Sequence, residues 1–353
     1  MIQRQTHVLE PNVVNPLLAE LREECLVHRF EVAPNPCVGA AIISGERVVG
    51  RGYHEAWGAP HAEVNAMNAA REAGVPLSDW DALVVTLEPC SSEGKTPSCV
   101  EAILEAGIPR VAIGAIDPDP RHSGEAVQLL EGAGVEVRLC EAPGKFEEQN
   151  AAFCSWVAPD RVRALRPWTI AKWAQTRTGQ LSPPEDVGEG RWISGPDSLA
   201  EVQRLRGRVD AILTGVGTVR SDDPRLSLRA PSGGTAPLRV VLDSYLRTPT
   251  TARLLEASVA DEAAGELAIL TLAGSDGARW RALKDAGAEV AGLRGDEQGR
   301  VSLLEVQGWL WERGVRRVLL ECGPELLASY FSSELVDQVR VYSGDVFGGR
   351  GVS

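Results

Sequence analysis

The pattern with the clearest chemical meaning is His61-Ala62-Glu63, followed downstream by Cys90 and Cys99. One imidazole and two thiolates are good zinc ligands, and three protein ligands leave tetrahedral Zn²⁺ one position open for water. A structural zinc would instead take four protein ligands. Two thiolates cancel the charge of the metal, so such a site acidifies water less than an all-histidine site. We therefore expect one zinc per chain, with the Glu63 carboxylate carrying the proton.

A His-x-Glu followed by Pro-Cys and a second Cys is the signature of zinc deaminases, in which the glutamate is not a ligand. His61 and Cys99 both fall at the start of predicted helices, where the helix dipole stabilises a thiolate and a bound anion. The pattern therefore predicts hydrolytic deamination of an amino-bearing ring carbon, with Glu63 passing protons to the departing ammonia.

The loop between the two cysteines is longer than in the commonest deaminase motif. Eight residues separate Cys90 from Cys99, and Lys95 and Thr96 among them are placed to reach a phosphorylated substrate. His54 directly follows a predicted strand. Its side chain could either contact the substrate or have a structural role, and the sequence leaves both open.

Composition limits the class of protein. The chain has 353 residues, 44% of them apolar, and a formal net charge of −13. This length predicts two domains with real cores, and the charge disfavours nucleic acid as a partner. The opening segment has no signal-peptide pattern and no apolar run is long enough for a membrane span, so we expect a cytoplasmic protein without membrane contact. Seven scattered cysteines make a poor disulfide framework.

Strand and helix patterns alternate in the first part of the chain, which favours a mostly parallel sheet covered by helices. We expect strands at 37–44, 47–53, 82–87, 110–115 and 135–139, and helices at 61–73, 97–106 and 124–133.

The prolines and charges of 141–167 mark the best boundary, after which a second alternating series begins. We expect strands at 168–174, 210–215, 238–244, 266–272, 316–321 and 336–344, and helices at 278–287 and 303–314. The predicted organisation is a domain over 1–145, a linker over 146–166 and a second domain over 167–353.

Candidate residues in the second half carry weaker signals. Lys172 lies on an apolar strand and needs an anionic partner; Glu321, at the end of another strand, is either that partner or a substrate ligand. Gly-Val-Gly-Thr at 215–218 offers backbone N–H groups to a phosphate, although such a match is often an ordinary turn. Arg206 and Arg229 have the planar fork that suits a phosphate.

Nine segments spread over both halves of the chain closely resemble the bacterial bifunctional riboflavin-biosynthesis deaminase/reductase family. The matching segments are PNPCVGAAI (34–42), GYHEAWGAPHAEVNA (52–66), VTLEPCSSEGKTPSC (85–99), DPDP (117–120), KWAQTRTG (172–179), GRWISGP (190–196), DAILTGVGTVRSDDPRL (210–226), PLRVVLDSYLRTP (237–249) and ECGPEL (321–326). The resemblance implies an α/β chain: a cytidine-deaminase-like three-layer α/β/α domain followed by a dihydrofolate-reductase-like α/β domain.

The resemblance also implies the activity. The first domain would deaminate 2,5-diamino-6-ribosylamino-4-pyrimidinone 5′-phosphate, and the second would use NADPH to reduce the ribosyl group to ribityl. A homo-oligomer, either a dimer or a tetramer, is expected.

Site roles carry over position by position. His61, Cys90 and Cys99 would bind zinc, Glu63 would shuttle protons, and Asn35 would bind the pyrimidine, with His54 and Lys95 as further substrate contacts. The NADP contacts would be Ala174, Trp192, Thr218, Asp222, Ser244 and Gly323. The substrate contacts of the reductase would be Lys172, Arg206, Leu226, Arg229 and Glu321.

The chain departs from the family pattern at several positions. Thr178 replaces an acid, Gly190 replaces a serine, Cys322 replaces a glycine, and Ser92-Glu93 replaces a frequent His-His pair. The chain also ends earlier than is usual in the family. These departures motivate an alternative, a deaminase with a degenerate reductase-like domain. A nucleic-acid-editing deaminase or an RNA-binding zinc module is a third hypothesis, which the net charge disfavours.

Overall fold

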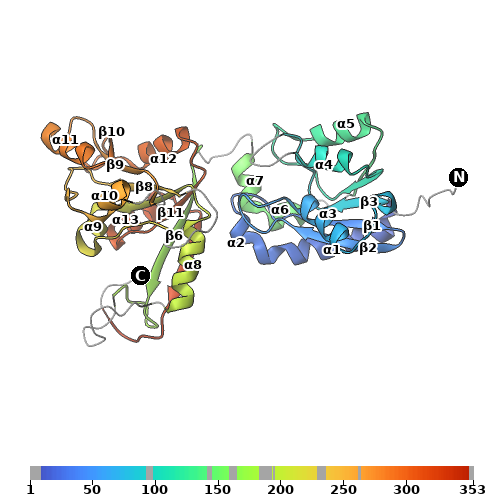
Figure 1. The fold of residues 1–353 in the computed structure, drawn as a ribbon, viewed down its shortest axis with the longest axis horizontal. Helices are drawn as coiled ribbons and strands as arrows, with labels where there is room; N and C mark the ends of the chain where they lie inside the picture. Colours follow the sequence, from blue (N-terminus) through green and yellow to red (C-terminus); the bar gives the residue numbers. More distant parts are fainter. Residues whose placement is uncertain are drawn as a thin grey trace. The chain divides into compact units, whose positions relative to one another are not determined.

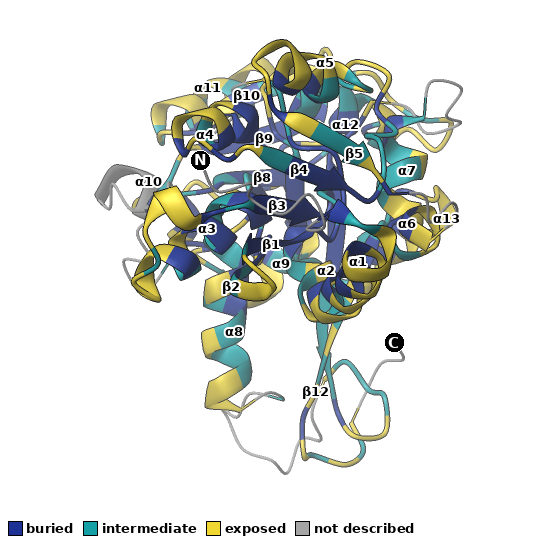
Figure 2. Cartoon of the chain, turned by 90° about the vertical axis from the view of Figure 1, so that its right-hand side faces the viewer, coloured by how far each residue is buried: buried dark blue, intermediate teal, exposed yellow. Residues whose placement is uncertain are grey.

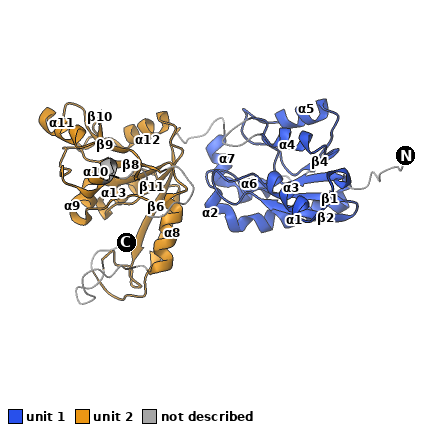
Figure 3. Ribbon diagram, in the orientation of Figure 1, with its two compact units in different colours: residues 1–164 blue, residues 165–353 orange. Residues whose placement is uncertain are grey.

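A computed structural model (Figure 1) describes residues 9–92, 98–140, 145–158, 165–182, 193, 195–228, 236–260 and 264–349. The chain divides into two compact units, Met1–Ala164 and Leu165–Ser353 (Figure 3). Among the described residues, no helix combines the length and apolar character that a membrane crossing requires.

The first unit contains a five-stranded sheet in the order β2-β1-β3-β4-β5. Its strands are β1 (Gly39–Ser44), β2 (Arg47–Tyr53), β3 (Ala82–Val85), β4 (Arg110–Ile113) and β5 (Glu136–Leu139). β1 is antiparallel to both β2 and β3, whereas β3, β4 and β5 are parallel. Four of the five strands therefore run in the same direction, and the expectation of a mostly parallel sheet holds except for β1, which runs against the others. The turn at Gly45-Glu46 is too short for a crossover, so β2 returns antiparallel beside β1.

Helices cover both faces of this sheet in three layers. They are α1 (Pro11–Cys25), α2 (Arg29–Val32), α3 (Ala62–Glu72), α4 (Cys99–Glu105), α5 (Glu125–Gly132), α6 (Lys145–Gln149) and α7 (Ala151–Val157). Successive side chains of β1 alternate between the faces: Ala40 and Ile42 pack in the core with α3, α4 and α5, and Ala41 and Ile43 pack against α1. Strands β1, β3 and β4 are buried along almost their whole length (Figure 2).

The segment assigned to a linker over 146–166 begins with structure that belongs to the first unit. It includes most of α6 and all of α7, and Phe146 is 2% exposed within the core that contains α3, α4 and α5. A linker cannot bury an aromatic side chain of this size, so the first unit extends beyond residue 145.

Helix α3 lies directly on the backbone of β2. A Cβ atom at Gly52 would come 2.1 Å from the Ala66 nitrogen, and one at Gly50 would come 2.3 Å from the Ala66 oxygen. Two glycines facing the alanines of α3 therefore set the distance between helix and strand, and with it the position of the residues that begin α3.

The second unit has a seven-stranded sheet in the order β10-β9-β8-β7-β11-β6-β12, in which every neighbouring pair is parallel. Its strands are β6 (Trp168–Gln175), β7 (Ala211–Gly215), β8 (Leu238–Leu242), β9 (Leu267–Leu272), β10 (Glu289–Leu293), β11 (Arg317–Leu320) and β12 (Gln338–Ser343).

The helices of the second unit are α8 (Pro196–Arg206), α9 (Val216–Asp222), α10 (Arg253–Ala260), α11 (Gly277–Asp285), α12 (Leu303–Glu312) and α13 (Pro324–Ser332). One core contains side chains of α12 and α13 and another contains side chains of α9, α10 and α11. The order of the strands reverses between β7 and β11, and ligands of open parallel sheets bind at such a point, beyond the carboxyl ends of the strands.

Candidate active sites

Three short elements bring the predicted zinc ligands together. His61 is the N-cap residue of α3, Cys99 is the first residue of α4, and Cys90 follows β3. Helix α4 begins at a defined point because the Ser98 hydroxyl accepts a hydrogen bond from the backbone N–H of Glu101, at 3.2 Å. Both helix starts assumed from the sequence are present.

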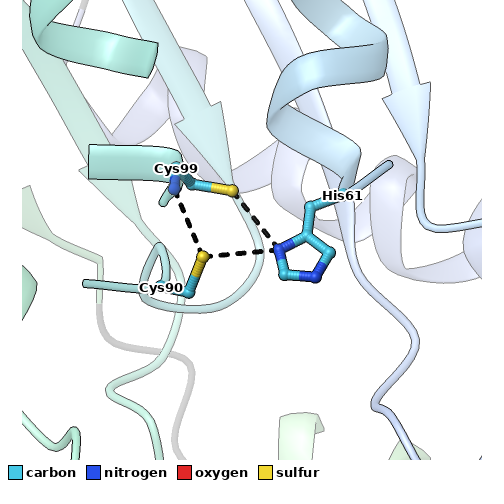
Figure 4. Close-up of side chains that lie close together, drawn as sticks. All are labelled: His61, Cys90 and Cys99. Carbon is cyan, nitrogen blue, oxygen red and sulfur yellow. Dashed lines mark hydrogen bonds between the residues drawn. The ribbon is translucent and has the colours of Figure 1, made fainter. Parts of the chain in front are cut away.

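The three ligand atoms converge as a metal site requires (Figure 4). Nδ1 of His61 lies 3.5 Å from Sγ of Cys90 and 3.3 Å from Sγ of Cys99, and all three atoms lie within 4.8 Å of one another. Ordinary zinc–sulfur and zinc–nitrogen bonds in a tetrahedron place nitrogen and sulfur about 3.5 Å apart. The donor set and its spacing therefore fit zinc.

The surroundings favour a thiolate and a protonatable carboxylate. Contacts with Cys99 and then with His61 outweigh burial and lower the pKa of Cys90 to about 4. Glu63 is 3% exposed, and burial raises the pKa of its carboxyl group above the ordinary value. A buried carboxyl with a raised pKa suits a group that accepts a proton and returns it.

The chain on both sides of Cys90 is tied to the first turn of α5. Glu88 is buried, and its carboxylate accepts hydrogen bonds from four backbone N–H groups, those of Asp117, Gly124, Ala126 and Val127. The Ser91 hydroxyl donates to Glu125 Oε2 at 2.6 Å. The role of Glu88 was not predicted from the sequence; the available signal was a charged residue directly after the apolar end of a predicted strand.

His54 is engaged within the protein through both ring nitrogens. Its Nδ1 lies 3.1 Å from the carbonyl oxygen of Pro60, an acceptor, so Nδ1 carries the proton; Nε2 then accepts from Nδ2 of Asn35, also at 3.1 Å. Burial lowers the pKa of His54 to about 4, which keeps the ring neutral. The amide of Asn35 is thereby oriented with its oxygen left for another partner.

The loop that carries Asn35 is held by Asn150, a residue near the C-terminal end of the first unit. The Asn150 side chain accepts a 2.7 Å hydrogen bond from the Cys37 backbone N–H, and its amide nitrogen lies 3.5 Å from the Cys37 carbonyl oxygen. Asn150 sits between α6 and α7, in the segment expected to be a linker, so no local pattern pointed to it.

The reductase candidates surround a cleft of about 1980 Å³ in the second unit. Every described member of the predicted set lines it: Lys172, Ala174, Arg206, Thr218, Asp222, Leu226, Ser244, Glu321 and Gly323. Three further candidates, Lys95, Trp192 and Arg229, lie outside the described residues, as do Gly190 and Glu93.

Glu321 joins two cations inside this cleft. Its carboxylate accepts from Nε and Nη2 of Arg206 at 2.7 and 3.0 Å, and Nζ of Lys172 lies 3.5 Å from Oε2. Burial raises the pKa of Glu321, but the charges of Arg206 and Lys172 outweigh it and bring the pKa below the ordinary value. The anionic partner that Lys172 requires is therefore present.

The loops after β7 and β11 meet at the point where the strand order reverses. The backbone N–H of Gly323 donates to the Thr218 hydroxyl at 3.1 Å, which joins the start of α13 to α9. Cys322 also lines the cleft, and burial followed by the nearby charge of Glu321 raises the pKa of its thiol to about 12.

Thr178, which stands where the family has an acid, accepts a 2.7 Å hydrogen bond from the Gly348 N–H.

Comparison with protein families matches both units. Residues 20–115 match the cytidine and deoxycytidylate deaminase zinc-binding region, and residues 167–352 match the RibD C-terminal domain. These matches indicate a zinc ion for the first unit and a nicotinamide cofactor for the second.

Similar proteins cover most of the chain. The riboflavin biosynthesis protein RibD of Aquifex aeolicus (strain VF5) is 33% identical over 91% of this chain and 83% of its own length. That of Bacillus amyloliquefaciens is 35% identical over 88% of this chain and 79% of its own length.

Solved structures of similar proteins also cover most of the chain. Acinetobacter baumannii RibD has a TM-score of 0.64 and 27% identity, covering 97% of this chain and 90% of that one. The diaminohydroxyphosphoribosylaminopyrimidine deaminase/5-amino-6-(5-phosphoribosylamino)uracil reductase of Thermotoga maritima has a TM-score of 0.63 and 28% identity, covering 97% and 89%. The chain therefore belongs to the RibD family of riboflavin-biosynthesis enzymes, which combine a deaminase with a reductase.

Proposed function

We propose that the chain carries out two successive reactions on one pyrimidine. The first is hydrolytic removal of the 2-amino group of 2,5-diamino-6-ribosylamino-4(3H)-pyrimidinone 5′-phosphate, and the second is NADPH-dependent reduction of the ribosyl group, giving 5-amino-6-(5-phospho-ribitylamino)uracil. We assign deamination to the first unit, Met1–Ala164, and reduction to the second, Leu165–Ser353. The convergence of His61, Cys90 and Cys99 beside buried Glu63 is the observation that carries the proposal.

In the deaminase unit we assign each step to a residue of the chain. His61, Cys90 and Cys99 would hold one zinc ion, which supplies a Lewis acid that lowers the pKa of water. Glu63 accepts the proton of the attacking water and delivers it to the departing ammonia. Asn35 presents its amide oxygen to the pyrimidine, because its amide nitrogen is already used by His54.

In the reductase unit the residues position the sugar. NADPH supplies the hydride when it is bound. Lys172 and Arg206 are cations beside the cleft, and each retains N–H groups that the contacts with Glu321 do not use. We assign them, with Leu226 and Arg229, to the ribosyl phosphate. Glu321 keeps both cations in place.

Compartment and assembly follow from particular residues. Thiolate ligands at Cys90 and Cys99 require a reducing compartment, which supports the cytoplasm. Val339 and Val341 expose apolar side chains on edge strand β12, which supports a homo-oligomer, a dimer or a tetramer. The net charge of −13 supports a small anionic substrate bound at local cations rather than nucleic acid or a membrane surface.

The test uses the full chain with the diaminopyrimidine phosphate, with and without NADPH, and identifies the products by mass. Without NADPH we expect the deaminated ribosyl product; with NADPH we expect the ribityl product. Glu63→Gln should retain zinc and release no ammonia. Protein without stoichiometric zinc, or a Glu63→Gln variant that deaminates at the full rate, would contradict the deaminase. Deamination with no NADPH oxidation would contradict the reductase alone.

A further inference from the structure

Two thiols of the first unit meet at the base of the loop that carries Asn35. Cys25 is the last residue of α1, and Cys37 lies two residues before β1. Both are free and buried, at 1% and 4% exposure, and with Val32 they form a small apolar cluster of their own. Neither belongs to the zinc ligands. A bond between them would close the segment 26–36, which contains Asn35.

The two thiols differ in their hold on a proton. Contact with the Cys37 thiol, followed by burial, raises the pKa of Cys25. Contact with Cys25 and then the charge of Arg29 outweigh burial and lower the pKa of Cys37. One thiol therefore favours the thiolate while its neighbour keeps its proton. In such a pair the thiolate attacks an oxidant, and the second thiol completes a disulfide.

Helix α1 has no room to move towards β1. A Cβ atom at Gly39 would come 2.8 Å from the carbonyl oxygen of Leu21, so the last turns of α1 already lie directly on the start of the strand. The Cys25 thiol donates to the carbonyl oxygen of Arg22 at 3.2 Å, which fixes the sulfur to the helix. Any approach of the two sulfurs must therefore come from the side of Cys37.

A disulfide would displace Cys37 against its contacts with Asn150. Asn150 accepts from the Cys37 N–H at 2.7 Å, and its amide nitrogen lies 3.5 Å from the Cys37 carbonyl oxygen. Non-bonded heavy atoms stay about 3.5–4 Å apart, whereas an S–S bond is about 2 Å long, so the sulfurs must approach by at least about 1.5 Å. Asn35 is two residues away, and its N–H donates to the Val32 carbonyl within the same segment. The displacement therefore reaches the residue that we assign to the pyrimidine.

We propose that Cys25 and Cys37 form a reversible disulfide that inactivates the deaminase when hydrogen peroxide is present. The Cys37 sulfur attacks one peroxide oxygen and the O–O bond breaks. The thiol proton leaves with the second oxygen as water, and a sulfenic acid remains. The Cys25 sulfur then attacks the sulfenic sulfur, and its proton leaves with the hydroxyl group as a second water. Two thiols are oxidised to one disulfide, and one peroxide is reduced to two waters.

The test treats the full zinc-loaded chain with a small excess of hydrogen peroxide, as wild type, as Cys25→Ala and as Cys140→Ala. Cys140 is also buried but packs in a different apolar cluster. Peptide mass spectrometry without reduction should find Cys25 joined to Cys37 in wild type and in Cys140→Ala. Deamination by these two proteins should fall at least about tenfold, with zinc retained, and should recover with dithiothreitol. Cys25→Ala should keep its rate of deamination.

The effect on activity rests on the proposed deaminase, and the outcomes separate the two. Reduced wild type that releases no ammonia would contradict the deaminase and with it the inactivation, whether or not the disulfide forms. Wild type that deaminates but forms no disulfide between Cys25 and Cys37, or that carries the bond and works at the full rate, would overturn only the switch.

Zinc content gives a second check. Equal inactivation of Cys25→Ala by peroxide, together with loss of zinc, would overturn the switch, because the oxidised thiols would then be those of Cys90 and Cys99. The disulfide mapping uses wild type alone and therefore does not depend on how well Cys25→Ala folds.

Discussion

The side-chain amide of Asn150 lies against both backbone polar groups of Cys37, although 113 residues separate the two in the sequence. Cys37 is two residues beyond Asn35, to which we assign the pyrimidine. The helices α6 and α7 therefore take part in the geometry of the substrate loop, far from the zinc ligands in sequence.

We predict that Asn150→Ala impairs the deaminase unit. The Cys37 N–H would be left buried without its acceptor, at a cost of about 1–3 kcal/mol in the free energy of unfolding. The KM for deamination should rise more than kcat falls, because the loop with Asn35 loses its anchor. Urea denaturation and steady-state kinetics measure both. Asn68→Ala, an exposed change on α3, is the control; equal behaviour of the two variants would refute this role.

Glu88→Gln should weaken zinc binding. An amide puts an –NH₂ group where the carboxylate oxygens now accept four backbone N–H groups, so the loop with Cys90 loses its attachment to α5. We expect zinc affinity to fall about tenfold, as for other changes outside the ligand set. Competition with a coloured chelator measures it. Glu101→Gln, an exposed change on α4, should bind zinc like wild type. Identical affinities for the two variants would argue against the attachment.

Two glycine substitutions should act in opposite directions. Gly52→Ala places a methyl group against the backbone of α3 and should cost at least about 1–3 kcal/mol, with loss of zinc as the helix moves. Gly132→Ala, at the end of α5 with nothing near its Cβ position, should stabilise the chain by about 0.5–1 kcal/mol. Thermal melting and zinc content check both. A Gly52→Ala protein with full zinc content would show that α3 has room to adjust.

The Glu321 cluster predicts a pH dependence of stability. Because the folded-state pKa of Glu321 lies below its ordinary value of 4.5, the carboxylate stabilises the fold above about pH 4.5. That stabilisation is lost as the pH falls through the lowered folded-state pKa. Glu321→Gln should therefore unfold more easily by about 1–3 kcal/mol at pH 7, since two half-buried cations lose their partner, and the deficit should shrink in acid.

Denaturant titrations at a series of pH values measure this deficit. Glu312→Gln, an exposed change at the end of α12, should show none. A deficit for Glu321→Gln that stays constant from pH 7 down to strongly acidic solution would exclude the ion cluster as its source.

The zinc site could be predicted because its chemistry depends on residue types close to helix starts. His61 and Cys99 lie at the starts of helices whose patterns are local, and Cys90 lies in the loop after β3. Glu88 is different, because its partners are backbone groups 29 to 39 residues further on. The type of a residue does not indicate which backbone groups it will bind, so this role becomes visible only in the fold.

Element boundaries were predicted well where periodicity was strong and poorly elsewhere. Strand β2 was predicted with the bounds it has. The elements that were not predicted are α1, α2, α6, α7, α8, α9, α10, α13 and β10. Helix α1 begins at Pro11, which is a start signal, but it has no side-chain cap, and Pro16 inside it is typical of a helix end. The direction of β1 relative to β3 depends on a crossover that passes over a neighbouring strand, which strand patterns alone do not specify.

The place of β6 in its sheet bears on synthesis. Trp168 opens this first strand of the second unit, yet its register partner is Arg317 in β11, and Ile170 pairs with Gln338 in β12. During translation, β6 leaves the ribosome long before either neighbouring strand is made. Its apolar side chains therefore stay exposed until β11 and β12 are available to pair with it. A chain released before β11 is made would lack the strand that joins β6 to β7 and would be prone to aggregation.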